Sequence, residues 1–160
     1  MDNKVLNLDL SATKGTTILV NNDPNAKIVL NLSDFGIYDR LRTGLTQLYE
    51  IFKELKDKMG NVAETEEPED DDSEAGAEKF IDIMKELDGK MRNTVDYIFS
   101  APVSDVCAPD GYMFDLFEGQ LRFEYIINAL SKLYENNLNK EFYTLKSRIN
   151  NKLPQYVGKK

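Results

Sequence analysis

Hydrophobic and polar residues alternate over the first part of the chain and then change to a helical spacing. The segments Val5–Leu10 and Lys27–Leu32 alternate with a period of two, and the β-branched run Thr16–Val20 lies between them. A period of two places successive side chains on opposite faces of a strand. The Asx-rich segment Asn21–Asn25 also contains a proline, and this composition is typical of turns. The pattern predicts two or three antiparallel strands, as a hairpin or small meander.

Three later stretches carry apolar residues at intervals of three and four, which is the pattern of amphipathic helices. The first follows the capping candidates Ser33 and Asp34 and stops at Gly60. Its apolar positions are Ile37, Leu41, Leu45, Leu48, Phe52, Leu55 and Met59. Gly44 is a weak point inside this helix, at a cost of about 1 kcal/mol relative to Ala.

The second stripe lies on residues 80–98 and ends before Pro102, because a proline disfavours helical geometry in the residue before it. A loop is expected from Ala101 to Gly111. The third stripe covers residues 114–153, and Gly119 is a candidate break near its start. Its sequence leaves open whether one helix or two follow.

These elements predict an α+β fold, mostly α, in which an N-terminal antiparallel hairpin or meander packs on three to four amphipathic helices. The stripes on 37–59 and 80–98 are expected to face each other as an antiparallel pair. The expected divisions are 1–60 as a β-rich start plus the first long helix, 61–77 as a disordered acidic linker, 78–153 as the helical part of the same domain, and 154–160 as a basic tail.

The net charge of −8 is concentrated in one place. Nine acids and no base lie between Glu64 and Glu78, and removing these nine from the 28 acids leaves 19 against 20 bases. A block of like charge repels itself and favours an extended, mobile linker. The weakly basic end after Lys140 lacks the charge density of a phosphate-binding surface, so we expect no nucleic-acid partner.

Residues that carry chemistry are scarce. The chain has no His and a single Cys, Cys107, so a common general base and an internal disulfide are both missing. Neither glycine-rich phosphate-binding pattern occurs, and Asp70–Asp72 lacks the spacing of a calcium loop. We therefore expect no enzymatic activity, no cofactor and no metal. The start of the chain lacks the pattern of a signal peptide, and no stretch is apolar enough to span a bilayer, so we expect a cytoplasmic protein.

Aromatic residues cluster between positions 114 and 134, where they could form core or line a partner site. Helical stripes of this kind also serve helix-in-groove recognition and self-association. The candidate partner-binding residues are Leu41, Leu48, Phe52, Phe114, Phe117, Phe123 and Tyr125.

The order of these segments resembles small proteins encoded in the tail modules of bacteriophages and prophages. The segments that carry the resemblance are Ile28–Asp34, Met91–Phe99, Phe114–Gly119 and Phe123–Ile127. The resemblance implies a tail assembly chaperone that binds a tape-measure or tail-tube partner through amphipathic helices. It implies no catalytic residue. The alternative is a structural component of the virion, such as a tail or connector subunit.

Overall fold

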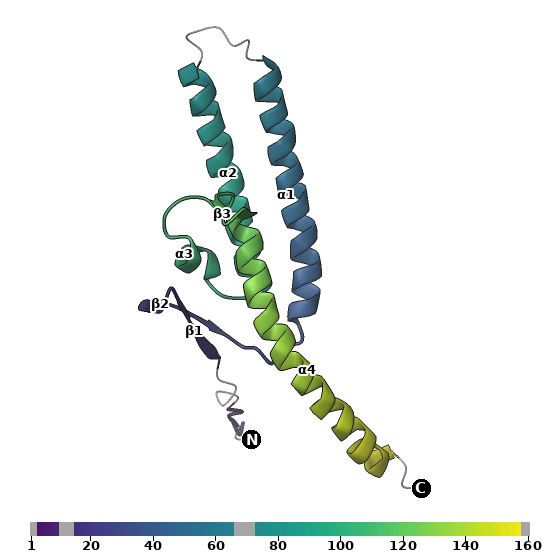
Figure 1. Cartoon of the computed structure of the whole chain (residues 1–160). Helices are drawn as coiled ribbons and strands as arrows, with labels where there is room; N and C mark the ends of the chain where they lie inside the picture. The colour runs from purple at the N-terminus through teal and green to yellow at the C-terminus, as the bar shows by residue number, and fades with distance from the viewer. Residues whose placement is uncertain (1–2, 10–14, 66–72, 158–160) are drawn as a thin grey trace.

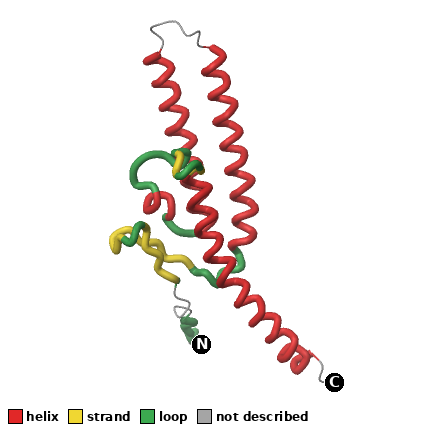
Figure 2. Tube along the Cα trace, viewed as in Figure 1, coloured by secondary structure: helices red, strands yellow, loops and turns green. Residues whose placement is uncertain are grey.

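A computed structural model describes the backbone of residues 3–9, 15–65 and 73–157, and the side chains of 3–9, 15–60 and 76–151. Its elements are β1 (Thr16–Val20), β2 (Asp23–Leu30), α1 (Ile37–Thr65), α2 (Ser73–Phe99), α3 (Val103–Cys107), β3 (Leu116–Phe117), β4 (Gln120–Leu121) and α4 (Arg122–Val157). Helices dominate, and the strands occupy one short stretch near the N-terminus and another just before α4 (Figure 2). The predicted α+β, mostly α fold is confirmed.

Helices α1 and α2 form a long antiparallel pair, and α4 crosses this pair and continues past one end of it (Figure 1). The pairing of the 37–59 and 80–98 stripes is therefore confirmed. The hairpin β1–β2 and the short helix α3 lie together beside α2 and α4. Helix α2 ends at Phe99, before Pro102, as predicted, while α3 adds one helical turn to the expected loop.

The hairpin β1–β2 is antiparallel and joined by a two-residue turn. Asn21 and Asn22 have φ values of 56° and 59°, so both residues are in the left-handed region. This is the geometry of a type I′ turn, and Asn tolerates it better than most residues. Ile18 pairs with Ile28 on the face that packs on the core, where Ile28 is 1% exposed. The predicted hairpin is therefore confirmed at 16–30.

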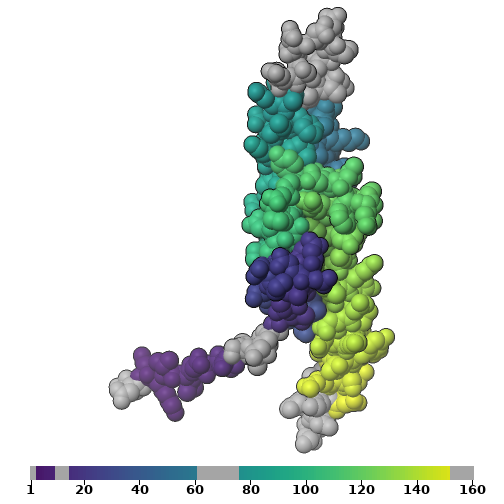
Figure 3. Space-filling model, turned by 60° about the vertical axis from the view of Figure 1, so that its left-hand side comes forward, coloured from purple at the N-terminus to yellow at the C-terminus, as the bar shows by residue number. Residues whose placement is uncertain are grey.

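The predicted first strand, Val5–Leu10, is wrong over the residues that the structure describes. None of residues 3–9 belongs to a strand, and Val5, Leu6 and Leu8 are 91%, 80% and 81% exposed. Figure 3 shows this segment standing away from the body. A strand needs a hydrogen-bonded neighbour, which alternation alone cannot supply. Leu10 lies outside the described residues.

The helices extend into the predicted linker 61–77. Helix α1 continues through Thr65, and α2 begins at Ser73. The linker is helical at both of its ends, and residues 66–72 lie outside the described part of the chain. At the other end, α4 runs without a break past Asn136 and Asn137 to Val157, so part of the predicted 154–160 tail is helical.

The buried seam of α1 is rotated relative to the predicted stripe. Leu48 and Ile51 are 3% and 8% exposed, whereas Leu45 is 46% exposed. Gly44 lies on the buried side, and a Cβ there would collide with the side chain of Ile98 on α2. The absent side chain at Gly44 therefore allows the two helices to approach closely.

A polar stripe on α2 fixes the loop that connects α2 to α4. Arg92 Nε donates to Asp88 at 2.7 Å, and Arg92 Nη2 donates to the carbonyls of Ala108 and Gly111 at 2.9 and 3.0 Å. Asp88 also accepts the Met113 amide at 2.6 Å. Because Arg92 and Asp88 are largely buried, these bonds hold the loop against α2.

Asp96 continues the same stripe one turn further along α2. Its two carboxylate oxygens accept the amide and the hydroxyl of Ser104 at 2.8 and 2.9 Å. Ser104 is 1% exposed and lies in the first turn of α3. Asp96 thus accepts hydrogen bonds from the amide and hydroxyl groups of Ser104 at the start of α3, which would otherwise have no acceptor there.

Candidate functional site

The structure divides the seven predicted partner-binding residues between core and surface. Leu48, Phe114 and Phe123 are 3%, 6% and 8% exposed, so they belong to the core and are not accessible to a partner of the folded chain. Their apolar spacing satisfied the pattern, but periodicity does not distinguish an internal contact from an external one. Leu41 is half-buried and packs against the core.

The other three predicted residues are exposed, and two of them meet. Phe52 on α1 is 40% exposed. Phe117 of β3 and Tyr125 of α4 are 44% and 45% exposed, and their rings touch edge to face with centroids 5.0 Å apart. The turn between β3 and β4 positions Phe117, because Glu118 and Gly119 both adopt positive φ values of 49° and 80°.

Phe117 and Tyr125 form one side of a pocket of about 370 Å³. The pocket lies between the end of the β1–β2 hairpin, the end of α3 and the first turns of α4. Its lining is mostly apolar and consists of Leu19, Val20, Asn21, Cys107, Phe117, Arg122, Tyr125, Ile126, Ala129 and Leu130. An apolar pocket with a few polar groups is the usual form of a site for a small ligand or an anchoring side chain.

Arg122 and Cys107 are ionisable residues of the pocket lining. Arg122 Nη1 donates to the Asp110 carbonyl at 2.8 Å and lies 3.8 Å from the Asp115 carboxylate. Burial, with a smaller contribution from the charge of Asp96, raises the pKa of the Cys107 thiol from 9.0 to about 11. Cys107 is thus protonated near neutral pH, which makes it a poor nucleophile.

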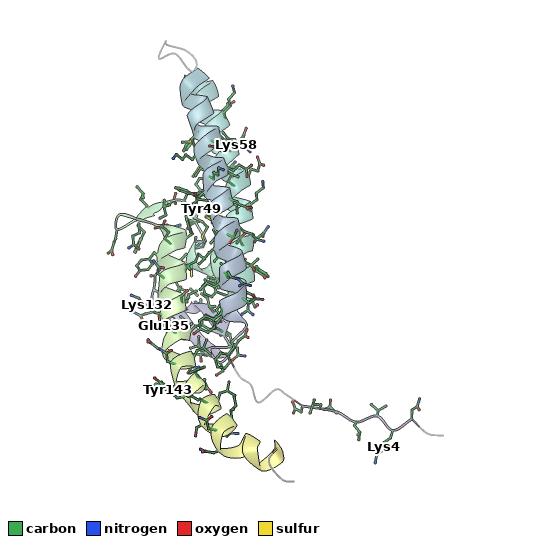
Figure 4. The ribbon with its side chains drawn as sticks, turned by 90° about the vertical axis from the view of Figure 1, so that its right-hand side faces the viewer. Lys4, Tyr49, Lys58, Lys132, Glu135 and Tyr143 are labelled. Atoms are coloured by element: carbon green, nitrogen blue, oxygen red, sulfur yellow. The ribbon has the colours of Figure 1, made fainter. Side chains whose placement is uncertain are left out.

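A second candidate surface lies on the C-terminal part of α4. Leu138 is 1% exposed and is the last buried apolar residue of the helix that the structure describes. Beyond it, Phe142, Leu145 and Ile149 are 55%, 44% and 46% exposed. Their spacing of three and four places them on one face, in continuation of Leu138. Figure 4 shows Tyr143 on this part of α4, past the end of the α1–α2 pair.

Polar contacts mark the point where α4 leaves the body. Asn137 Nδ2 donates to the Leu32 carbonyl at 2.9 Å, and the Ser33 hydroxyl lies 3.3 Å from the Glu141 carboxylate. Both contacts join α4 to the connection between β2 and α1. We call residues 139–151 the projecting segment of α4.

The projecting segment has more basic residues than acidic ones. Lys140, Lys146 and Arg148 are exposed, and Glu141 is its single acid. The other long exposed face, on α1, contains Tyr49 at 71% exposure. That helix carries charges of both signs, including the Lys58–Glu54 pair that contacts α2.

Hydrogen bonds shift the pKa of an acid at the base of α1. Burial acts to raise the pKa of Asp34, but hydrogen bonds from Arg40 and the Gly36 amide, with the charge of Arg40, leave it below the usual value. Arg40 Nη2 donates to Asp34 at 2.8 Å, and Arg40 Nε donates to the Ile98 carbonyl at 2.9 Å. This arrangement ties the start of α1 to the end of α2, so its role is structural.

The described part of the chain has no candidate metal site. The Cys, Asp and Glu side chains there form no group of three or more that could hold a metal ion. No described helix is long and apolar enough to cross a membrane.

Comparison of the chain with protein-family models, with curated protein sequences and with solved structures gives no significant match. Inference about function therefore depends on the surfaces described above.

Proposed function

We propose that this chain is a non-enzymatic protein that works in phage or prophage tail assembly by binding another protein, and that the projecting segment of α4 is its main binding surface. The observation that carries the proposal is the apolar stripe of Phe142, Leu145 and Ile149, which has no cover among the described residues. Stripes of this spacing are stable in water when another surface covers them.

The length of the projection supports an interaction role. Helix α4 has 36 residues and extends well past Leu138, its last buried apolar residue among those described. A helical segment as short as residues 139–151 is marginal in water when it packs on nothing, because its backbone hydrogen bonds barely offset the lost conformational entropy. A partner that packs on the stripe would stabilise the helix and bury its apolar residues in one step.

The charges around the stripe indicate what kind of partner fits. Helical spacing places Lys146 and Arg148 on either side of the apolar residues, and Lys140 adds a third positive charge to the segment. Two such segments would repel each other, whereas an amphipathic helix with acidic flanks would be attracted. We therefore propose an acidic amphipathic helix of a tape-measure or tail-tube protein as the ligand, with the tail class taken from the sequence resemblance.

The test is capture of tail proteins by the tagged full chain from phage-infected or prophage-induced cells. We expect a tape-measure or tail-tube protein to co-purify, and the double variant Phe142→Ser, Ile149→Ser to reduce its yield at least tenfold. The control is Tyr49→Ser, which removes a more exposed aromatic from α1 and is expected to leave the yield unchanged.

The results of this capture experiment, together with the composition of purified virions, distinguish an assembly chaperone from a structural subunit of the virion. Equal capture by the wild type and the double variant would contradict the assignment of the projecting segment. Absence of any tail protein from the captured material would contradict the tail-assembly role. Presence of the chain in purified virions would overturn the chaperone version and support a structural tail or connector subunit.

A further inference from the structure

Strand β1 has an open edge. The sheet that contains it has two strands, so β1 pairs on one side with β2 and pairs with no strand on the other, among the described residues. Such an edge presents unpaired amide and carbonyl groups in a row. A further strand of suitable length could satisfy these groups.

The pocket described above lies at the end of β1. Its contributions from the hairpin are Leu19 and Val20 at the end of β1 and Asn21 in the turn. Its opposite wall is α4, through Tyr125 and Ala129 among others. A strand added to β1 would lie over the pocket, and alternate side chains of that strand would point into it. Edge pairing combined with a side-chain pocket is the arrangement used in β-strand addition.

The chain contains a segment with the properties of such a strand. Residues 4–8, here called the donor segment, read Lys-Val-Leu-Asn-Leu, and Leu6 and Leu8 would lie on one face of a strand. The segment has five residues, like β1, and both would span about 17 Å in extended form. Leu6 and Leu8 are 80% and 81% exposed, so both side chains are accessible to a partner.

The donor segment lies away from the β1–β2 hairpin of its own chain. Figure 3 shows it projecting sideways from the body, and Figure 4 places Lys4 far from the helices. An exposed apolar segment in this position is accessible to another molecule.

We propose that the donor segment of one copy adds to the open edge of β1 in a second copy, with Leu6 and Leu8 entering the pocket beside Cys107. The ligand of this site is therefore an extended apolar peptide segment, and its source is a second copy of this chain. This self-association uses a surface distinct from the projecting segment of α4, so it does not depend on the proposed function.

Cys107 is the only cysteine in the chain, which provides a direct test. In the variant Leu8→Cys, the new thiol would enter the pocket of a second copy and form a disulfide with Cys107 under mild oxidation. We expect a covalent dimer on a non-reducing gel, and a yield at least fivefold lower when Cys107→Ser is added. The matched control is Asn7→Cys, whose side chain points to the opposite face of the strand and should give little Cys107-dependent product.

Three results would overturn the proposal. An intramolecular disulfide in Leu8→Cys would show that the segment folds onto its own hairpin. Equal dimer yields from Leu8→Cys and Asn7→Cys would show that no strand register places Leu8 in the pocket. A dimer yield that does not depend on Cys107 would show that the pocket is not involved.

Solution mass gives a second test that needs no cross-link. We expect sedimentation equilibrium of the wild type to show association, and the double variant Leu6→Asp, Leu8→Asp to weaken it at least tenfold. Both leucines are exposed in the described structure, so this variant should unfold at the same temperature as the wild type at low concentration. An unchanged association constant in the variant, or a wild type that stays monomeric at about 100 μM, would contradict the proposal.

Discussion

The two parts of α4 have the same apolar periodicity and opposite surroundings. In the first part, Leu130, Tyr134 and Leu138 are 6%, 3% and 1% exposed, and the Tyr134 ring stacks on Phe99 with centroids 6.1 Å apart. In the projecting segment, Phe142 and Leu145 continue the pattern at 55% and 44% exposure. Periodicity therefore identifies the apolar face of a helix. The tertiary fold determines whether that face packs on the core of the same chain or stays exposed.

The body of the protein and the projecting segment also differ in what their charged side chains contact. Arg92 on α2, beneath the connection to α4, is surrounded by carbonyl and carboxylate acceptors, and its side chain is 18% exposed. Arg148 in the projecting segment is exposed. Charges in the body hold the connecting loop in place, whereas charges on the projection are available to a partner.

The largest expected effect comes from Arg92→Met. The substitution leaves Asp88, which is 7% exposed, as an uncompensated buried charge and releases the loop carbonyls. We expect a loss of about 3–5 kcal/mol in the free energy of unfolding, measured by urea denaturation. Arg148→Met, in the projecting segment, should change it by less than about 0.5 kcal/mol. Equal effects would remove the distinction between the two regions.

The second comparison uses a matched pair of leucines on α4. Leu138→Ala opens a cavity in the core and should cost about 2–5 kcal/mol. Leu145→Ala should cost less than about 0.5 kcal/mol, because little of its side chain is covered by the chain. Thermal and urea unfolding check both values. A large loss at Leu145 in a monomeric sample would mean that the chain itself covers the stripe.

Two glycine-to-alanine substitutions test the packing of the α1–α2 pair, one at a glycine that faces the other helix and one at a glycine that faces open space. Gly44→Ala places a methyl group against Ile98 and should destabilise the fold by about 1–3 kcal/mol, despite the higher helix propensity of Ala. Gly89 on α2 has open space around it, so Gly89→Ala should stabilise by up to about 1 kcal/mol. A melting temperature that rises for both variants would show that α1 and α2 do not pack closely at Gly44.

The smallest effect concerns pH and the Asp34–Arg40 pair at the base of α1. The pKa of Asp34 in the folded state lies below 3.8, so its contribution to stability is complete above pH 3.8 and is lost as pH falls through the folded pKa. Asp34→Asn should therefore be less stable than the wild type at pH 6, and the difference should shrink towards pH 2. A constant difference across this range would exclude the ionised pair as its cause.

The sequence predicted the hairpin and the long helices because their signals are local. Turn-forming Asn21 and Asn22 and the spaced apolar residues of α1 are sufficient to locate those elements. The rotated seam of α1 could not be predicted, since Gly44 is buried by a neighbour that is distant in sequence. The polar stripe of Asp88, Arg92 and Asp96 was also missed. Charges four residues apart on a helix look like a solvated face until the connecting loop is known to lie over them.

The candidate site was predicted in part, for a similar reason. Phe117 and Tyr125 were identified from aromatic clustering and lie on the surface, while Phe114 and Phe123 have the same spacing and lie in the core. The apolar run from Leu138 to Ile149 was visible in the sequence, but its exposure depends on where α4 leaves the body. That point is set by long-range contacts such as the hydrogen bond from Asn137 to Leu32.

Amide hydrogen exchange along α4 of the full chain measures directly whether the projecting segment is a free binding surface. We expect strong protection over residues 122–138 and weak protection over 139–151 in the free protein, because the apolar residues of the first part are packed against the body. Adding the captured tail protein should slow exchange over 139–151 and leave 122–138 unchanged. Equal protection of both parts in the free protein, or no slowing over 139–151 on binding, would show that the projecting segment is not the binding surface.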